Sequence, residues 1–368
     1  MKENRCKKCG ILMKYPGASN NTDTCNYCNS FTRKSFKGTS ALIKRLFDAP
    51  FIGVSVSGGK DSLFVWNWAV STFGADRVIA FNHCKVNAVD PIATQNIKNA
   101  SNILHSKVIY IMDNEFYPRF LENLKTYIQN PNPAILRAVL CAGCRNGISN
   151  RIFEECSKYN VSKVLNGSSY LELAPFKGYA MKEYGHGNET RGLLYGLAEC
   201  NDYLTSDNLL TIIQDHFNCH AVNLSNKPNA YDIDYIDFFD YFENNPAQIS
   251  ELVTTKLNWK HPEGCTWHFD CIVEDFKQLF YYMAYGYTEL DYKFSEMVRY
   301  NLLSREEALK KLITQTNTII SNIPYLRDEL TTWYMPTEII EKFDIMCANF
   351  KHTLHCACLL YTSPSPRD

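Results

Sequence analysis

The fold is decided by the stretch Ile52-Gly-Val-Ser-Val-Ser-Gly-Gly-Lys-Asp-Ser-Leu-Phe64, which changes character twice. Its apolar start is typical of a buried strand, and its polar end is typical of the first turn of a helix. Between them, Gly58 and Gly59 let the backbone approach a ligand without a Cβ in the way. The first amides of a helix after such a turn point at an anion with the positive end of the helix dipole. The stretch therefore predicts a phosphate-binding loop.

The side chains of this loop suit the same ligand. Ser57 and Ser62 can donate hydroxyl hydrogen bonds, Lys60 brings a positive charge, and Asp61 can cap the helix or hold Mg²⁺. The loop does not match the Walker A motif, because Val54 stands where that motif has its first glycine and Asp61 follows the lysine. We therefore expect a phosphate loop of another class.

The sequence around the loop alternates short β-rich runs with longer helical ones. We expect helices at 39–47, 63–73, 93–104 and 148–159, and strands at 51–56, 77–83, 107–112 and 163–166. This alternation predicts an α/β fold with a doubly wound, mostly parallel sheet. From about residue 233 onward, aromatic-rich helical stretches predict a separate helical lobe, in which Ser304 and Glu307 form a capping box.

These patterns suggest a division of the chain into three parts. We expect a zinc knuckle at 1–38, an ATP-binding α/β domain at 39–232 and a helical C-terminal lobe at 233–350. Residues 358–368 resemble a sequencing adapter translated in one frame, so we expect them to be foreign to the protein and its natural C-terminus to be missing.

Composition places few limits on function. The chain has 368 residues, 45% of them hydrophobic, enough for one large core or two smaller ones. With 38 basic and 39 acidic side chains, the net charge of -1 gives no general preference for nucleic acid or a membrane surface. The N-terminus lacks the apolar core of a signal peptide, and no stretch approaches the roughly 18 apolar residues of a membrane span. We therefore expect a cytoplasmic protein with no membrane span.

Four cysteines near the N-terminus have the spacing of a zinc site. Cys6 and Cys9 form one C-x-x-C pair, and Cys25 and Cys28 form another, so each pair can hold one side of a tetrahedron. A site closed by four thiolates leaves no open position for catalysis, which favours a structural or partner-docking role. The first 45 residues are rich in lysine and arginine; this surplus either compensates the thiolate charge or contacts nucleic acid.

A second pair, Cys141 and Cys144, leaves several interpretations open. With Cys265 or Cys271 as third ligand, the pair could bind a metal or a 4Fe-4S cluster. It could also be a redox pair, or two reduced thiols in a packed helix start. A disulfide framework is not expected in a long chain without an export signal.

The segment Ser57-Gly-Gly-Lys-Asp-Ser62, directly after a strand, resembles the PP-loop of the N-type ATP pyrophosphatases, which have an adenine nucleotide alpha hydrolase-like fold. The resemblance implies that Mg²⁺-bound ATP is cleaved between its α and β phosphates, that the loop keeps pyrophosphate, and that AMP is transferred to a carbonyl oxygen. It implies Lys60 and Asp61 as catalytic residues. The nucleotide-binding residues that it implies are Ser57, Gly58, Gly59, Lys60, Asp61, Ser62, Phe81, Asn82, His83 and Gly167.

Two branches of that superfamily combine this loop with an N-terminal double C-x-x-C. One is the tRNA 2-thiolation enzymes, whose internal C-x-x-C holds an iron-sulfur cluster with a third cysteine, and Leu140-Cys-Ala-Gly-Cys-Arg145 resembles that pattern. These enzymes typically carry Gly-His-x-x-Asp-Asp after the next strand. The present chain has Asn166-Gly-Ser-Ser-Tyr-Leu-Glu172 instead.

The other branch is the N-acetyl sugar amidotransferases of surface-polysaccharide biosynthesis. The chain is similar to them in the cysteine segment from Arg5 to Cys28 and in three later stretches, Gly286-Tyr-Thr-Glu-Leu-Asp291, Phe294-Ser-Glu-Met-Val-Arg299 and Leu303-Ser-Arg-Glu-Glu-Ala-Leu309. This resemblance spans about residues 5–315, with 175–255 poorly covered. The later stretches favour the sugar branch.

By that resemblance, ATP would adenylate the acetamido oxygen of a nucleotide-linked or lipid-linked N-acetyl sugar. Ammonia from a separate glutaminase subunit would then displace AMP and leave an acetamidino group. The alternatives are a thiolation enzyme that acts on tRNA and a non-catalytic PP-loop adaptor that docks through its zinc knuckle.

Overall fold

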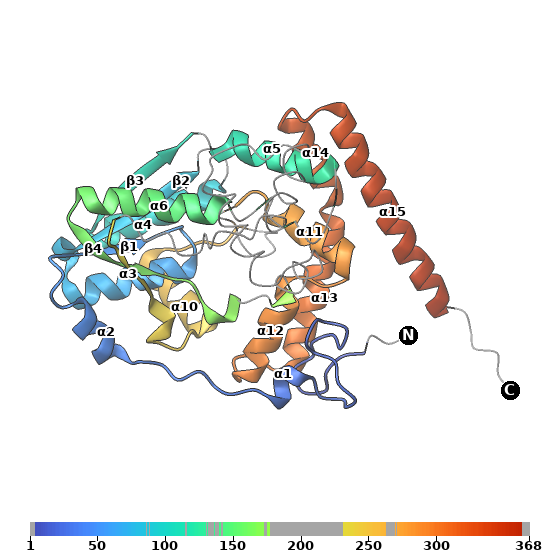
Figure 1. Cartoon of the computed structure of the whole chain (residues 1–368), viewed down its shortest axis with the longest axis horizontal. Helices are drawn as coiled ribbons and strands as arrows, with labels where there is room; N and C mark the ends of the chain where they lie inside the picture. Colours follow the sequence, from blue (N-terminus) through green and yellow to red (C-terminus); the bar gives the residue numbers. More distant parts are fainter. Residues whose placement is uncertain are drawn as a thin grey trace, which may run out of the picture.

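A computed structural model shows an α/β protein built on a five-stranded parallel sheet (Figure 1). It describes residues 4–172, 175–176 and 231–362, apart from gaps at 86, 88, 115, 130, 132–135, 137–139, 141–142, 263–268 and 270. The strands are β1 (Phe51–Ser55), β2 (Val78–Lys85), β3 (Lys107–Asp113), β4 (Val161–Asn166) and β5 (Asp234–Asp237). Their order in the sheet is β3-β2-β1-β4-β5, and every pair is parallel.

Helices cover both faces of this sheet. On β2, the side chains of Val78 and Ala80 pack into one core, and those of Ile79 and Phe81 pack into another on the opposite face, as expected for the twofold alternation of a strand. The first face is covered by α3 (Lys60–Phe73), α4 (Pro91–Leu104) and α10 (Pro246–Leu257), and the second by α6 (Gly143–Lys158). Two apolar faces explain why the strands read as nearly continuous hydrophobic runs.

The helices that follow residue 273 pack beside this unit (Figure 1, orange to red). They are α11 (Glu274–Tyr285), α12 (Glu289–Arg299), α13 (Arg305–Ser321), α14 (Ile323–Thr332) and α15 (Thr337–Thr362). With α5 (Phe116–Gln129) they enclose an aromatic core in which Phe276, Phe280 and Phe343 are fully buried. The expected capping box is present, since Ser304 Oγ accepts from Glu307 N and Glu307 accepts from Ser304 N.

The cysteine segment belongs to the same aromatic core. The short helix α1 (Asn26–Asn29) and the turns before it lie against α12 and α13, where Arg305 Nε donates to the Cys6 carbonyl at 3.2 Å. Tyr15 of this segment is buried against Tyr287 and Tyr292. The expected knuckle at 1–38 therefore shares its core with the C-terminal helices, although it is distant from them in sequence.

The expected boundary at residue 233 is placed differently by the structure. Residues after it form β5, which pairs with β4 and extends the sheet, and α10, which packs on α3. The all-helical part begins only at α11. β5 has four residues with aspartate at both ends, so its alternation was too short to read as a strand.

A short helix, α2 (Thr39–Leu46), precedes β1 as expected.

Among the described residues, the 3-10 helices are η1 (Ala75–Arg77), η3 (Tyr170–Glu172) and η5 (Phe238–Asp240). Within the described part of the chain, none of the helices combines the length and the apolar character needed to cross a bilayer.

Candidate phosphate-binding site

The loop between β1 and α3 has room for backbone only. Gly58 has a φ of +88°, and a Cβ built on it would lie 2.3 Å from the carbonyl oxygen of Ala93 on α4. Both the left-handed conformation and this distance exclude any other residue without a rearrangement. Gly59 then serves as the N-cap of α3, so the first amides of that helix are directed out of the carboxyl edge of the sheet.

Hydrogen bonds hold the loop in this shape. Ser62 Oγ accepts from Ser57 N at 3.2 Å and donates to the Gly59 carbonyl at 2.9 Å. The Gly58 carbonyl accepts from Trp259 Nε1 at 3.1 Å and from Asn96 Nδ2 at 3.3 Å. Because these donors come from α4 and from the chain after α10, the loop is shaped by the fold before any ligand binds.

The two charged residues of the loop form an ion pair. Lys60 Nζ lies 2.6 Å from one carboxylate oxygen of Asp61. The other oxygen accepts from Asn244 Nδ2 at 3.1 Å, and Asn244 is almost completely buried. Asp61 is thereby oriented from two sides, as a carboxylate that binds a divalent cation needs to be.

Gly167 completes this edge of the site. It follows β4, and a Cβ at this position would lie 3.0 Å from Ser62 N and 3.1 Å from the Asp61 carbonyl carbon. The absence of a side chain lets the two segments approach each other. The six loop residues Ser57–Ser62 and Gly167, all expected at the nucleotide from the sequence, therefore lie side by side at the carboxyl edge of the sheet.

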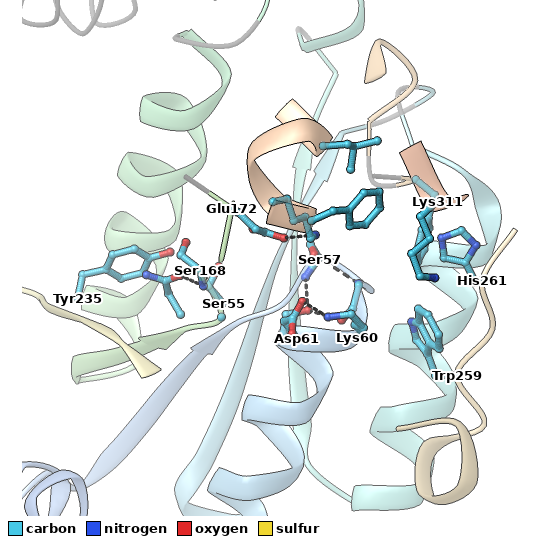
Figure 2. Close-up of a pocket in the computed structure, with 18 residues that line it drawn as sticks. Ser55, Ser57, Lys60, Asp61, Ser168, Glu172, Tyr235, Trp259, His261 and Lys311 are labelled. Carbon is cyan, nitrogen blue, oxygen red and sulfur yellow. Dashed lines mark hydrogen bonds and ion pairs between the residues drawn. The ribbon is translucent and has the colours of Figure 1, made fainter. Parts of the chain in front are cut away.

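Two cavities meet at the loop, and Ser55 and Ser57 line both of them. The first, of about 520 Å³, lies between the loop and the C-terminal helices (Figure 2). In this view Glu172 lies on one side of Lys60 and Asp61, and Trp259 lies on the other. The charged and histidine side chains that line it are Lys60, Asp61, Glu172, His261, Lys293 and Lys311.

The second cavity, of about 700 Å³, lies between the ends of β1 and β2 and helix α4. Two of the three residues expected at the adenine, Asn82 and His83, line it. The side chain of the third, Phe81, is fully buried under α6 against Tyr159, so only its backbone lies at this edge of the sheet, where its carbonyl accepts from Val56 N. A cavity of this size at the carboxyl ends of parallel strands is the usual place for a nucleotide.

His83 is held in place by β3. Its Nε2 lies 3.0 Å from Asp113 Oδ2, and Arg151 Nε lies 3.4 Å from the same oxygen. Burial lowers the pKa of His83 despite the opposing effect of the Asp113 carboxylate. Burial therefore favours the neutral form of this histidine in the cavity.

The residues of this site that the sequence reasoning missed include Glu172, Asn244, Trp259, His261, Lys293 and Lys311. Asn244 reaches Asp61 across 183 positions of the chain, and no periodicity or spacing in the sequence connects the two. Glu172 ends the stretch Asn166–Glu172, which departs from the motif of the thiolation enzymes, and Lys293 lies between the stretches that resemble the sugar branch, so no motif pointed to either residue.

The four N-terminal cysteines come together as the spacing predicts. Their sulfur atoms all lie within 4.8 Å of one another, with Cys6 and Cys28 at 3.9 Å and Cys9 and Cys25 at 3.6 Å. A tetrahedral zinc ion with Zn–S bonds of about 2.3 Å requires S–S separations of about 3.8 Å. The cluster therefore fits a metal such as zinc.

Electrostatics around this cluster also favour a cation. The hydrogen bond from the Cys28 thiol lowers the pKa of Cys25 to about 4, and the same contact raises the pKa of Cys28. Arg299 Nη1 donates to Cys9 Sγ at 3.4 Å, which compensates part of the thiolate charge.

The second cysteine set is only partly described. Cys144 lies in the first turn of α6, and Cys271 is half-buried just before α11. Cys141 and Cys265 lie outside the described residues, so a metal or iron-sulfur site at this set stays a prediction.

Comparison with known proteins gives no family. A scan against protein-family models found no match, and a search of the curated proteins found none.

Proposed function

We propose that this chain is an ATP-dependent adenylating enzyme of the PP-loop class, with a doubly wound sheet of the adenine nucleotide alpha hydrolase-like type. The observation that carries the proposal is the position of the Ser57–Ser62 loop, which lies at the carboxyl edge of β1 where the two cavities meet. A nucleotide could place its adenosine between β1 and β2, beside Asn82 and His83, and its phosphates at the loop.

The residues present suit each part of this reaction. The loop amides and Lys60 would stabilise the negative charge that develops as pyrophosphate leaves the α-phosphorus. Asp61, oriented by Asn244, would hold Mg²⁺, which neutralises phosphate charge when bound. The aromatic and polar wall with Trp259 and His261 leaves space for an acceptor beside the loop.

The acceptor that we propose is the acetamido group of an N-acetyl sugar, linked to a nucleotide or a lipid. Its oxygen attacks the α-phosphorus, pyrophosphate leaves, and the amide becomes an O-adenylated imidate. Ammonia then adds to the imidate carbon and AMP departs with the oxygen, leaving an acetamidino group. A separate glutaminase subunit would supply the ammonia, and the supply of ATP and activated sugars places this chemistry in the cytoplasm.

The test is pyrophosphate release from Mg²⁺-ATP with N-acetyl sugars and ammonium ion, compared with bulk tRNA and a sulfur donor. We expect Asp61→Asn and Ser57→Ala to reduce release by about a hundredfold or more, as for the loss of one preorganised catalytic contact. Asp76→Asn is the matched control, because Asp76 is exposed in η1 and should leave release unchanged.

Unchanged release in both loop variants would rule out the assignment of the loop. Release with tRNA alone would support the thiolation enzyme, and an absence of release with every acceptor would support the adaptor.

A further inference from the structure

Helix α12 presents one face to the loop cavity. Leu290, Lys293 and Phe294 all line the 520 Å³ cavity, and their spacing places them on the same side of the helix. Lys293 is the charged member of this face, and its side chain is only 12% exposed. The C-terminal helices thus bring a buried cation to the cavity that contains Lys60 and Asp61.

The charge of Lys293 is balanced within the protein. Its Nζ lies 3.4 Å from Glu172 Oε1, longer than the roughly 2.7–2.9 Å of a strong charge-assisted hydrogen bond. Burial lowers the pKa of Lys293, the nearby charge of Lys60 lowers it further, and Glu172 opposes both effects. Three lysines, Lys60, Lys293 and Lys311, and two carboxylates, Asp61 and Glu172, line this cavity, so a polyphosphate would meet a surplus of positive charge there.

Contacts at both ends of α12 fix the position of Lys293. At the start, Thr288 and Asp291 form a capping box, and Asp291 also pairs with Arg5 at 3.6 Å. At the end, Arg299 donates to Cys9 in the cysteine cluster. A cation on a helix anchored in this way is held with little conformational freedom, which suits a binding residue.

We propose that Lys293 is a second phosphate-binding residue, which contacts the pyrophosphate part of ATP together with Lys60. This inference rests on the proposed function. Glu172 acts as a positioning residue that holds the ammonium before ATP binds. The C-terminal helices thereby become part of the phosphate site.

Calorimetric titration of the full chain with Mg²⁺-pyrophosphate and with AMP tests this role. Lys293→Met should weaken pyrophosphate binding by about tenfold to a hundredfold, the effect of losing one hydrogen bond to a charged group in a buried site. AMP binding should change less than about twofold. Lys293→Arg, which keeps the cation, should retain most of the affinity.

Lys310→Met is the matched control, because it removes the same charge from an exposed position on the neighbouring helix α13 and should leave both affinities unchanged. The double variant Lys293→Met/Glu172→Gln tests whether Lys293 binds pyrophosphate or only balances the charge of Glu172. The glutamine removes the carboxylate whose ion pair Lys293→Met would break. Circular dichroism checks that each variant is folded.

We expect the double variant to stay as weak for pyrophosphate as Lys293→Met. Recovery of wild-type affinity in the double variant would overturn the inference, because Lys293 would then only balance Glu172. Unchanged affinity in Lys293→Met would overturn it as well. Failure of the wild-type chain to bind ATP or pyrophosphate would instead refute the proposed function on which the inference rests.

Discussion

Gly58 and Gly74 have nearly the same φ angle and differ in their surroundings. Their φ values are +88° and +87°, but a Cβ at Gly58 would lie 2.3 Å from a carbonyl oxygen, whereas a Cβ at Gly74 would meet nothing within 4 Å. Replacing each glycine by alanine therefore compares the cost of a positive φ alone, at Gly74, with the cost of a positive φ and a collision with α4, at Gly58.

We predict that Gly58→Ala destabilises the protein by about 1–3 kcal/mol more than Gly74→Ala, because the loop must shift to avoid Ala93 in addition to the backbone strain. It should also abolish detectable ATP binding, which Gly74→Ala should preserve. Urea unfolding and calorimetric titration measure the two effects. Equal losses of stability with intact ATP binding would show that the loop accepts a side chain.

At the scale of elements, α12 connects three parts of the molecule. Its first turn holds the capping box, its middle lines the loop cavity, and its last turn reaches Cys9. In the box, Thr288 Oγ1 accepts from Leu290 N at 3.2 Å, and Asp291 accepts from Thr288 N at 2.9 Å. Thr288 is buried, so these groups have little access to water.

We predict that Thr288→Ala lowers the free energy of unfolding by about 1–2 kcal/mol, the usual cost of losing an N-cap side chain. Thr314→Ala is the control, because Thr314 is exposed inside α13 and only bonds the carbonyl of Lys310 in its own helix. That change should stay within about 0.5 kcal/mol of wild type. A Thr288→Ala effect as small as the control would argue against the cap.

At the scale of the whole molecule, the cysteine cluster and the C-terminal helices share one hydrophobic core. Cys6, Cys9 and Cys25 are buried in the same core as Phe276, Phe280 and the other aromatic residues of those helices. A metal ion at the four thiolates would therefore stabilise the helices that line the loop cavity, and its loss would affect more than the N-terminal turns.

We predict that the purified protein contains zinc and that Cys9→Ser loses it, with a fall in Tm of at least about 2 °C. The basis is a shift of about 1 °C per kcal/mol in a chain of this size and a loss of more than about 2 kcal/mol. Cys156→Ala is the control, because Cys156 is buried under the sheet and away from the cluster. Elemental analysis and thermal unfolding measure both quantities, and full zinc retention in Cys9→Ser would contradict this site.

Several features were predictable because they depend on neighbours in the sequence. The strand, turn and helix around Gly58, the alternating pattern through β4 and the capping box of Ser304 all follow from local conformation and short-range spacing. The cysteine cluster followed from two C-x-x-C pairs, since each pair is itself a local unit.

The contacts across long stretches of chain were not predictable. β5 was missed because its four residues gain their stability from pairing with β4. The link from Asn244 to Asp61, and the approach of Lys293 to the loop, depend on how separate elements pack.

The sequence by itself determined the glycine turn between β1 and α3, the α/β class and the four-cysteine cluster, since each depends on residues close together in the chain. Only the tertiary structure decided which side chains surround the loop. The packing of α12 adds Lys293, the segment after β5 adds Asn244, and the cysteine segment joins the C-terminal core. These arrangements result from burying apolar surface between elements that are distant in sequence. Local sequence patterns do not predict which distant elements come into contact.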